Sequence, residues 1–415
     1  MSDVSLSPAA LFDTRSEFAR DLPVELIAAW LHGRQTAAAA REILAPYRVT
    51  GTAVLSDSAG LTRLARQREP LEVMALINRP KELVHEAGTA IGGQAMGVWT
   101  ADNTAMFYPE TIGGDRIAAM LLAVQDRIRA ECEVQIGIGA HFDTCFLIGN
   151  ALYGLAARTV ECMAEDRTAG GEIVLTSAAW ERVRNSAEPF QAVSRSEIAC
   201  EFTDGFRLLD GPRLPWPERG IKRYPLPFSG DFYECLAGYD GHGSPDLPRR
   251  RAMERFARHC TVLLVERAPV EEETAESDIL REMTRAAIAR ARGAWLLAST
   301  SGSEVKTAGS LSIYVFDEAN EAWTFAAALR KALESEGIPT RSGLATGEVL
   351  MFELEDGGRE ISGCPVNMAS KIAQDQGEFG RIYLVDAETG QGAPELKVSP
   401  VSFQVAGVEI PVWIG

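Results

Sequence analysis

The sequence lacks several features that define whole classes of protein. It has seven cysteines in 415 residues and no C-x-x-C pair, which argues against a disulfide scaffold or a zinc site and predicts reduced thiols in a cytoplasmic protein. Its apolar runs, such as VLLV at 262–265 and WLLA at 295–298, are too short to span a bilayer. Its first residues have no basic segment followed by an apolar core, so we expect no secretory signal.

Positive charge is also scarce. Lys and Arg number 41 against 58 Asp and Glu, for a net charge of −17, and this excludes nonspecific binding to nucleic acid or to anionic membranes, which needs clustered cations. The five histidines show no metal-ligand spacing and are expected on the surface or in the core: His32, His85, His141, His242 and His259. What remains is an intracellular enzyme or regulator that acts on a small molecule.

The sequence contains an internal repeat, which is the first thing to look for in a chain of this length. Similar segments recur in the same order at a nearly constant spacing. They are AVLSD at 53–57 and VLLVE at 262–266, GEIVLT at 171–176 and GRIYLV at 380–385, and QIGIGA at 135–140 and RSGLATG at 341–347, where Gly137 is aligned with Gly343. A helix with small residues also recurs, with Arg158 aligned with Lys371. We therefore predict two homologous domains, 51–212 and 256–415.

Two further segments have no partner in the repeat. Residues 1–50 are rich in Ala and Leu and predict one or two helices, whereas residues 213–255 are rich in Pro and Gly, cannot sustain a long helix and predict a linker. Either segment offers a place for an unknown regulatory protein to bind. The oligomeric state does not follow from the sequence.

Within each repeat, strand and helix patterns alternate with hairpin-like pairs of strands. This order is typical of an α+β, ferredoxin-like domain with helices packed on one face of a sheet. The expected fold is two such domains in tandem, preceded by N-terminal helices.

Asp57 and Asp102 are the first candidates for chemistry. Asp57 ends an apolar strand, and the turn that follows contains Gly60 and Thr62, which suits a phosphate cradle at the start of a helix. Asp102 lies in a turn between two apolar segments, and two carboxylates at neighbouring strand ends bind Mg²⁺ together with substrate phosphates. The alternative is structural, with Asp57 as a helix cap and Asp102 as an ordinary turn residue.

These motifs resemble those of the class III nucleotidyl cyclases. VLSDSAGLTRL at 54–64 is similar to the family's first metal motif, and WTADNTAMFY at 99–108 takes the place of the second. In the second repeat, KTAGSLSIY at 306–314 and REISGCPVNMASKIA at 359–373 resemble the second catalytic domain of mammalian adenylyl cyclases. The resemblance implies two domains that pair head to tail, with the active site at their interface.

The resemblance also implies a division of roles. The first domain would bind two Mg²⁺ or Mn²⁺ ions through Asp57 and Asp102, whose counterparts in the second domain are Glu266 and Ser310. The second domain would read the adenine of ATP through Lys306 and Glu360. In the first domain, Val98 stands at the position of Lys306 and Gly154 stands near the position of Asn367.

Two further residues of the second domain would complete the site, with Asn367 orienting the ribose and Lys371 stabilising the transition state. The two domains have therefore lost complementary halves, which predicts one composite site for converting ATP to cyclic AMP and pyrophosphate.

Three departures from the family pattern support a rival function. The family's transition-state Arg is replaced by Lys371, which keeps the charge but loses the planar pair of donors. The residue before Asp102 is Ala101 instead of Gly, and the last hairpin, FQVAGVEI at 403–410, has no Lys for the terminal phosphates. The rival is a catalytically silent homologue that binds nucleotide or a partner and signals by conformation. A guanylate cyclase is a third possibility, although it would be expected to have an acid at position 306.

Overall fold

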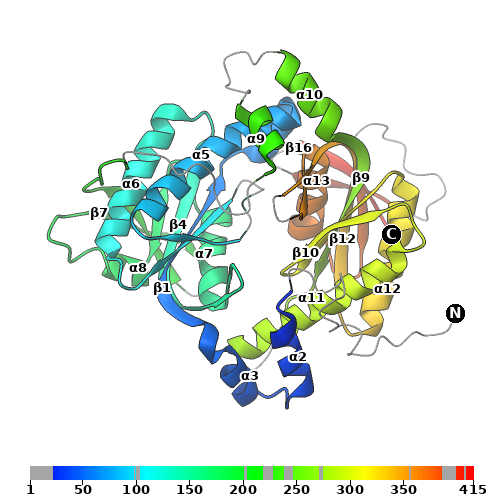
Figure 1. The fold of residues 1–415 in the computed structure, drawn as a ribbon, viewed down its shortest axis with the longest axis horizontal. Helices are drawn as coiled ribbons and strands as arrows, with labels where there is room; N and C mark the ends of the chain where they lie inside the picture. Colours follow the sequence, from blue (N-terminus) through cyan, green and yellow to red (C-terminus); the bar gives the residue numbers. More distant parts are fainter. Residues whose placement is uncertain are drawn as a thin grey trace. The chain divides into compact units, whose positions relative to one another are not determined.

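The structure is a computed structural model that describes residues 22–97, 99, 103–200, 203–217, 228–237, 246–270, 274–354, 357–385, 399–405 and 408–415. The chain forms two compact units, each built on one of the predicted repeats (Figure 1). The first-repeat unit comprises 44–64 and 71–248, and the second-repeat unit comprises 1–43, 65–70 and 249–415.

The first-repeat unit is built on an eight-stranded sheet in the order β2-β3-β1-β4-β6-β8-β7, with β5 paired to β4. The strands are β1 (Arg48–Ser58), β2 (Gln94–Ala95), β3 (Thr104–Pro109), β4 (Ile136–Ile148), β5 (Ala151–Tyr153), β6 (Ile173–Thr176), β7 (Gln191–Cys200) and β8 (Thr203–Asp210). Only β4 and β6 run parallel, while the other pairs are antiparallel. The helices are α4 (Leu61–Gln67), α5 (Pro70–Ala90), α6 (Gly114–Glu131), α7 (Leu155–Asp166), α8 (Ser177–Glu181) and α9 (Gly230–Ala237).

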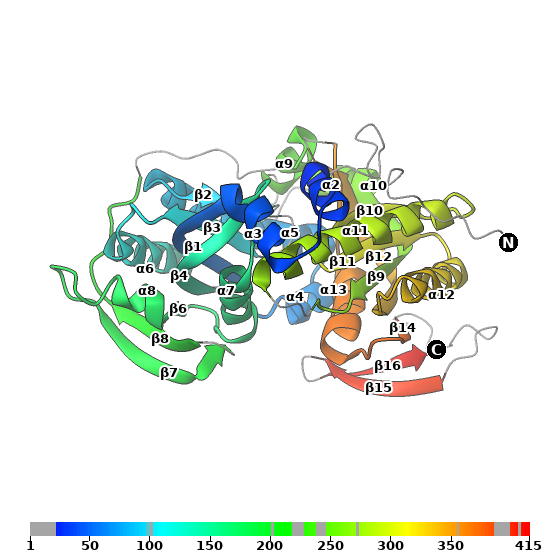
Figure 2. The same cartoon turned by 90° about the horizontal axis from the view of Figure 1, so that it is seen from below.

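The second-repeat unit has the same topology, with the order β10-β11-β9-β12-β14-β16-β15 and β13 paired to β12. Its strands are β9 (Ala257–Arg267), β10 (Ser303–Ala308), β11 (Leu311–Phe316), β12 (Thr340–Glu353), β13 (Arg359–Ser362), β14 (Ile382–Val385), β15 (Ser399–Val405) and β16 (Val408–Ile414). Its helices are α10 (Asp246–Phe256), α11 (Ala275–Leu297), α12 (Ala319–Ser335) and α13 (Cys364–Lys371), the last continued by a π-helix over Ile372–Gln376. Both sheets end in a long hairpin, β7–β8 and β15–β16 (Figure 2). The predicted α+β fold with a repeated domain is thus confirmed.

Helices cover both faces of each sheet, and the expectation of helices on one face alone is wrong. In the second-repeat unit, Leu263 and Val265 pack with α11 and α12, whereas their neighbours Val262 and Leu264 pack with α13. Alternate residues of a strand point to opposite faces, so both faces are apolar and both need a cover.

Two glycines allow the covering helix to lie close to the sheet. A Cβ atom at Gly343 would lie 2.2 Å from the carbonyl oxygen of Ala369 in α13, and one at Gly139 would lie 3.1 Å from the amide nitrogen of Ala164 in α7. A Cβ at Gly343 would clash with the backbone of α13, and one at Gly139 would require its neighbours to shift by a few tenths of an ångström, so both glycines allow a close approach of helix and sheet.

The strand pairing corrects one detail of the repeat. Gly139 pairs with Leu55, and Gly343 pairs with Leu264, which occupies the same position in β9 as Leu55 in β1. Gly139 is therefore the counterpart of Gly343, and the alignment of Gly137 with Gly343 is wrong by two residues. Position 137 corresponds to Arg341.

Outside the repeats, two N-terminal helices precede the first sheet: α2 (Val24–His32) and α3 (Ala37–Leu44), followed by a 3₁₀ turn over Ala45–Tyr47. Helix α2 buries Leu26, Ile27 and Trp30 and packs against α11. The segment predicted as a linker contains α9 and part of α10, and Phe228 and Phe232 within it are fully buried. It therefore packs against the protein instead of only connecting the repeats.

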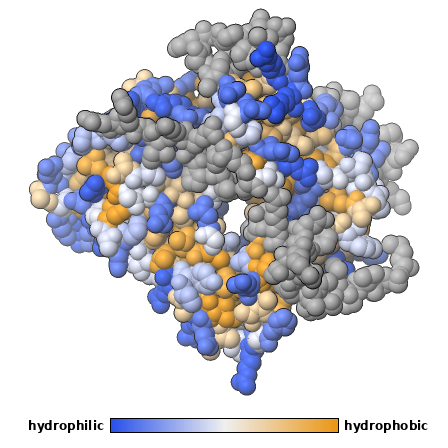
Figure 3. Space-filling model, in the orientation of Figure 1, coloured by the Kyte–Doolittle hydropathy of each residue, from blue (hydrophilic) through white to orange (hydrophobic). Residues whose placement is uncertain are grey.

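Within the described residues, no helix is long and apolar enough to cross a membrane. The large apolar side chains that are exposed belong to separate elements, and hydrophilic and apolar residues are interspersed on the surface (Figure 3). These residues are Leu155, Val193, Leu209, Trp295 and Phe379.

The described cysteines are mostly free, at 132, 145, 235, 260 and 364. Cys162 is disulfide-bonded, so the expectation that all seven are reduced thiols is wrong at this position. Spacing along the chain cannot reveal a bond between residues that only folding brings together.

Candidate functional site

Asp57 lies at the end of β1, which is paired with β3 on one side and β4 on the other. It is partly buried and pairs with Gly137 of β4. The preceding residue, Ser56, pairs with Thr104 of β3, and their hydroxyl oxygens are 2.6 Å apart. Ser56 and Thr104 form the last pair between β1 and β3, and Asp102 precedes Thr104 by two residues in the chain. Asp102 itself lies outside the described residues.

The turn after Asp57 is open. Gly60 has a φ of 79° and an added Cβ would meet nothing within 4 Å, so glycine is favoured there by backbone conformation and not by packing. Its carbonyl accepts a hydrogen bond from the amide of Leu64 at the start of α4. Thr62 lies in the first turn of this helix, and its side chain lies outside the described part of the structure.

Lys306 and Glu360 lie together in the second-repeat unit. Lys306 is on β10 and Glu360 on β13, and the Lys306 Nζ donates to the Glu360 Oε1 at 2.6 Å. The Glu360 side chain is 7% exposed and that of Lys306 is 37% exposed. A fixed acceptor and a more accessible donor therefore lie side by side.

Asn367 and Lys371 lie on one face of α13, because they are four residues apart. The helix follows Gly363, whose φ is 147°. The Lys371 Nζ lies 3.2 Å from Asp375 Oδ2, and both side chains are nearly half exposed. The ammonium group is thus held by a weak surface ion pair and remains available to another anion.

The second-repeat unit has an ion pair at the position that corresponds to Asp57. Glu266 accepts a hydrogen bond of 2.5 Å from Arg341 Nε, and the two side chains are 15% and 18% exposed. The guanidinium also donates to the carbonyl of Gly377 at 2.8 Å and lies 4.8 Å from the ring centre of Phe379. Its charge neutralises the carboxylate.

A second arginine fills the neighbouring position. Arg267 is 2% exposed and donates to the carbonyl of Gly309 and, at 2.9 Å, to Ser312 Oγ. Its backbone amide donates to the carbonyl of Ser310, the counterpart of Asp102. Burial lowers the pKa of Arg267 to about 10, so it stays protonated at neutral pH.

The first-repeat unit has no acid at the position that corresponds to Glu360. Ile148 of β4 pairs with Ala151, just as Phe352 of β12 pairs with Glu360, so Ala151 stands where the second unit has Glu360. Val98, which the sequence alignment places at the position of Lys306, lies outside the described residues.

The helix that follows corrects two further alignments. Gly154 precedes α7 with a φ of 103°, as Gly363 precedes α13, so Gly154 is the counterpart of Gly363 and not of Asn367. Counting from these glycines, Arg158 corresponds to Asn367, and the alignment of Arg158 with Lys371 is wrong by one helical turn. The counterpart of Lys371 is the disulfide-bonded Cys162.

The two units differ in how well the carboxylates at the corresponding positions, Asp57 and Glu266, suit a divalent cation. In the described part of the chain, which does not include Asp102, no three His, Cys, Asp or Glu side chains come together as a metal cluster. Glu266 does not fit, because Arg341 occupies it. Asp57 fits, since it lies on a strand end beside an open turn, and hard cations take one or two carboxylates plus phosphate oxygens.

Sequence reasoning missed Arg341, Arg267 and Lys81. Lys81 is 1% exposed in α5 and donates to the carbonyl of Trp99. The histidines at 85 and 141 are buried, in agreement with the prediction of packed residues.

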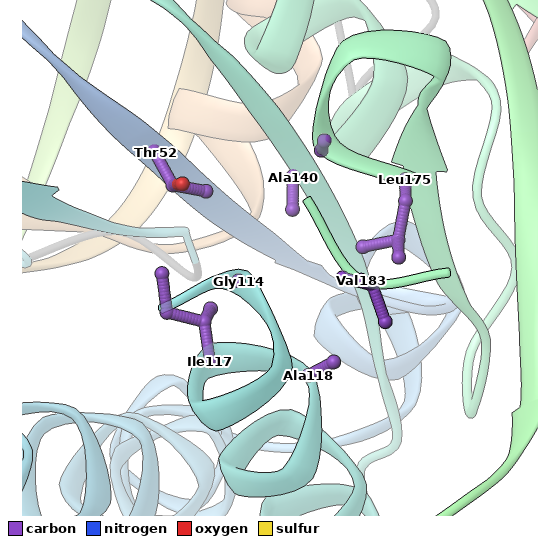
Figure 4. Close-up of a pocket in the computed structure, with 8 residues that line it drawn as sticks. Thr52, Gly114, Ile117, Ala118, Ala140, Leu175 and Val183 are labelled. Carbon is purple, nitrogen blue, oxygen red and sulfur yellow. The ribbon is translucent and has the colours of Figure 1, made fainter. Parts of the chain in front are cut away.

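A small cavity lies between α6, α8 and the first sheet (Figure 4). Seven of its eight lining residues have no polar side-chain atom, and the eighth is Thr52. None of the predicted site residues lines it, and we regard it as a packing gap.

No protein-family model and no curated protein matches the sequence. Among solved structures, a class III adenylyl cyclase-like ATP-binding protein from Pseudomonas aeruginosa is similar over 81% of this chain and 83% of its own, with a TM-score of 0.51 and 12% identity. The adenylyl cyclase CyaB from P. aeruginosa matches 42% of this chain and 98% of its own, at a TM-score of 0.34 and 15% identity.

An adenylate/guanylate cyclase/hydrolase from Silicibacter pomeroyi matches 38% of this chain and 96% of its own, at a TM-score of 0.31 and 24% identity. The match that spans both units shows that the chain has the class III nucleotidyl cyclase fold, with two cyclase-like sheets in tandem.

Proposed function

We propose that this chain, with its two class III cyclase-like domains, binds ATP at one composite site and converts it to cyclic AMP and pyrophosphate. The first-repeat unit would supply Asp57 and Asp102, and the second would supply the base-reading residues. The observation that carries the proposal is an asymmetry: the unit that keeps Lys306 beside Glu360 has an arginine bound to its own Glu266.

Lys306 and Glu360 would read the adenine edge. The ammonium group has three donors and spends one on Glu360, so a donor remains for a ring nitrogen, and the carboxylate has further lone pairs for the exocyclic amino group. Because Glu360 is buried, it is fixed in place before the base arrives. A nucleobase that cannot match this donor and acceptor leaves the remaining lone pairs of a buried carboxylate without a hydrogen bond, which is costly.

Divalent cations held by Asp57 and Asp102 would lower the pKa of the ribose 3′-hydroxyl and neutralise the phosphates. The chain's own residues would do the rest. Asn367 would hold the ribose so that the 3′-oxygen faces the α-phosphorus, and Lys371, one turn along the same helix face, would donate to the phosphate oxygens as charge develops on them.

A silent nucleotide-binding protein is the second candidate, and two observations favour it. Lys371 lacks the two-pronged geometry of arginine and shares its charge with Asp375. The last hairpin, β15–β16, carries no lysine or arginine in either strand. The solved protein that matches both units is described as ATP-binding, which agrees with either candidate.

The test is cyclic nucleotide production from ATP or GTP with Mn²⁺, combined with direct measurement of ATP binding. Asp57→Asn should abolish turnover, and the matched change in the second unit, Glu266→Gln, should leave it. Lys306→Met should weaken ATP binding by about 10- to 100-fold, the value of a hydrogen bond from a charged group. ATP binding that depends on Lys306 without any product would establish the silent homologue, and a protein that binds no ATP would refute both candidates.

A further inference from the structure

The structure contains a fully buried lysine that the proposed chemistry does not use. Lys81 is 1% exposed, on a face of α5 where Ile77 and Val84 are also buried. An ammonium group in such surroundings is costly unless hydrogen bonds compensate for its lost water. The polar contacts of Lys81 must therefore stabilise its charge.

One of these contacts is with the backbone of Trp99. The Lys81 Nζ donates to the Trp99 carbonyl at 2.9 Å and lies 5.7 Å from the ring centre of Phe228. Trp99 is itself fixed, since its indole N–H donates to the carbonyl of Met96 at 2.8 Å and the ring of His85 lies against it edge-on. Both the side chain and the carbonyl of Trp99 are held, away from competing water.

Trp99 lies three residues before Asp102 in the chain. On the other side of Asp102, the Thr104 hydroxyl is hydrogen-bonded to Ser56, the neighbour of Asp57. Polar contacts thus anchor the chain on both sides of the segment 100–103. We propose that Lys81 is a positioning residue for the metal site: by holding the Trp99 carbonyl, it fixes the chain three residues before Asp102.

Comparison of the two repeats supports a functional role over a purely structural one. Gly88 of α5 and Gly293 of α11 lie against the same position of their sheets, at Met106 and Tyr314. Counting back from these glycines, the counterpart of Lys81 is Ala286, which is buried without any charge. The fold forms without a lysine here, and the lysine is present only in the unit that keeps the metal-binding aspartates.

The inference rests on the proposed function, because it assigns a role at that site. The test compares Lys81→Met, which keeps the volume and removes the hydrogen bond, with His85→Leu, which alters the packing of the same Trp99 ring one turn along the helix. Binding of Mn²⁺ in the presence of ATP is measured by electron paramagnetic resonance. Amide hydrogen exchange of residues 94–109 is measured without metal.

For Lys81→Met we expect Mn²⁺ binding about tenfold weaker, the usual effect of losing a group that orients a metal ligand, together with faster exchange of residues 94–109. His85→Leu, which leaves the hydrogen bond to the Trp99 carbonyl in place, should have a smaller effect on both. Lys81→Arg, which keeps a charged donor, should recover part of the affinity.

Unchanged Mn²⁺ affinity in Lys81→Met, or equal losses in both variants, would overturn the inference. If the wild type itself binds no Mn²⁺, the proposed function fails. The exchange rates then still decide whether Lys81 holds this segment, and unchanged rates would overturn that as well.

Discussion

Replacement of Arg341 by methionine should destabilise the second-repeat unit. Methionine keeps the apolar stem but removes the guanidinium, which leaves Glu266 as a carboxylate that is 15% exposed and without its cation. Breaking a buried ion pair at one partner costs about 3–5 kcal/mol. Because both side chains retain some exposure, we expect about 3 kcal/mol for Arg341→Met.

Thermal unfolding followed by calorimetry and by circular dichroism would measure this cost. For a domain of this size, each kcal/mol corresponds to about 2–4 °C in Tm, so the transition of the second-repeat unit should fall by about 6–12 °C. The Glu266→Gln variant and the double variant complete a double-mutant cycle, in which a coupling of about 1–3 kcal/mol is expected for groups in direct contact.

The reasoning depends on the carboxylate being left uncompensated. If Arg341→Met lowers stability by less than about 1 kcal/mol, or if the cycle shows no coupling, then the ion pair does not neutralise this position. The exclusion of cations from the second-repeat unit would then need another explanation.

Three further outcomes are expected. Gly343→Ala should lower the free energy of unfolding, measured with denaturant, by about 2–3 kcal/mol, because the added Cβ would lie 2.2 Å from the Ala369 carbonyl oxygen. Gly139→Ala should lower it distinctly less, because the nearest atoms there lie at 3.1 Å. Equal losses of stability in the two variants would contradict this. Burial lowers the pKa of His85, so its folded-state value lies below that of the unfolded chain, and stability should decrease as the pH falls below about 6.5. His85→Leu should flatten that slope, and an unchanged pH profile of denaturant midpoints would disprove the assignment. If the chain is an enzyme, Lys371→Arg should raise its turnover with Mn²⁺ and ATP by about tenfold or more, because the planar donor pair is restored, and a loss of turnover would argue against a transition-state role for this residue.

The repeated α+β fold follows from sequence, because it is encoded in strand and helix patterns that recur in order. The alignment errors have a common cause. Aligning Gly137 instead of Gly139 with Gly343 shifts a strand by two residues, and a shift of two leaves every side chain on the same face of the sheet. Aligning Arg158 with Lys371 instead of Asn367 shifts a helix by four residues, or about one turn, which also preserves the face. Periodicity cannot detect a slip of one full period.

Contacts between distant side chains are a second limit. Arg341 reaches Glu266 only because β12 and β9 pair in the observed register, and nothing in the local sequence marks it as the partner of that carboxylate. In the sequence, Lys81 cannot be distinguished from an exposed helix lysine, and only the structure shows that it is buried. The proximity of Lys306 and Glu360, which lie 54 residues apart, came from the family resemblance and not from spacing.

The two arginines of the second-repeat unit, Arg341 and Arg267, also limit which substitutions the chain can accept during evolution. Restoring a cation site there would require acids at positions 266 and 310 of suitable length and the removal of both Arg341 and Arg267. Each step taken alone leaves a buried charge or a carbonyl without its partner, at a cost in stability that a marginally stable domain cannot absorb. The ion pair therefore makes the proposed division of roles between the two halves hard to reverse by single substitutions.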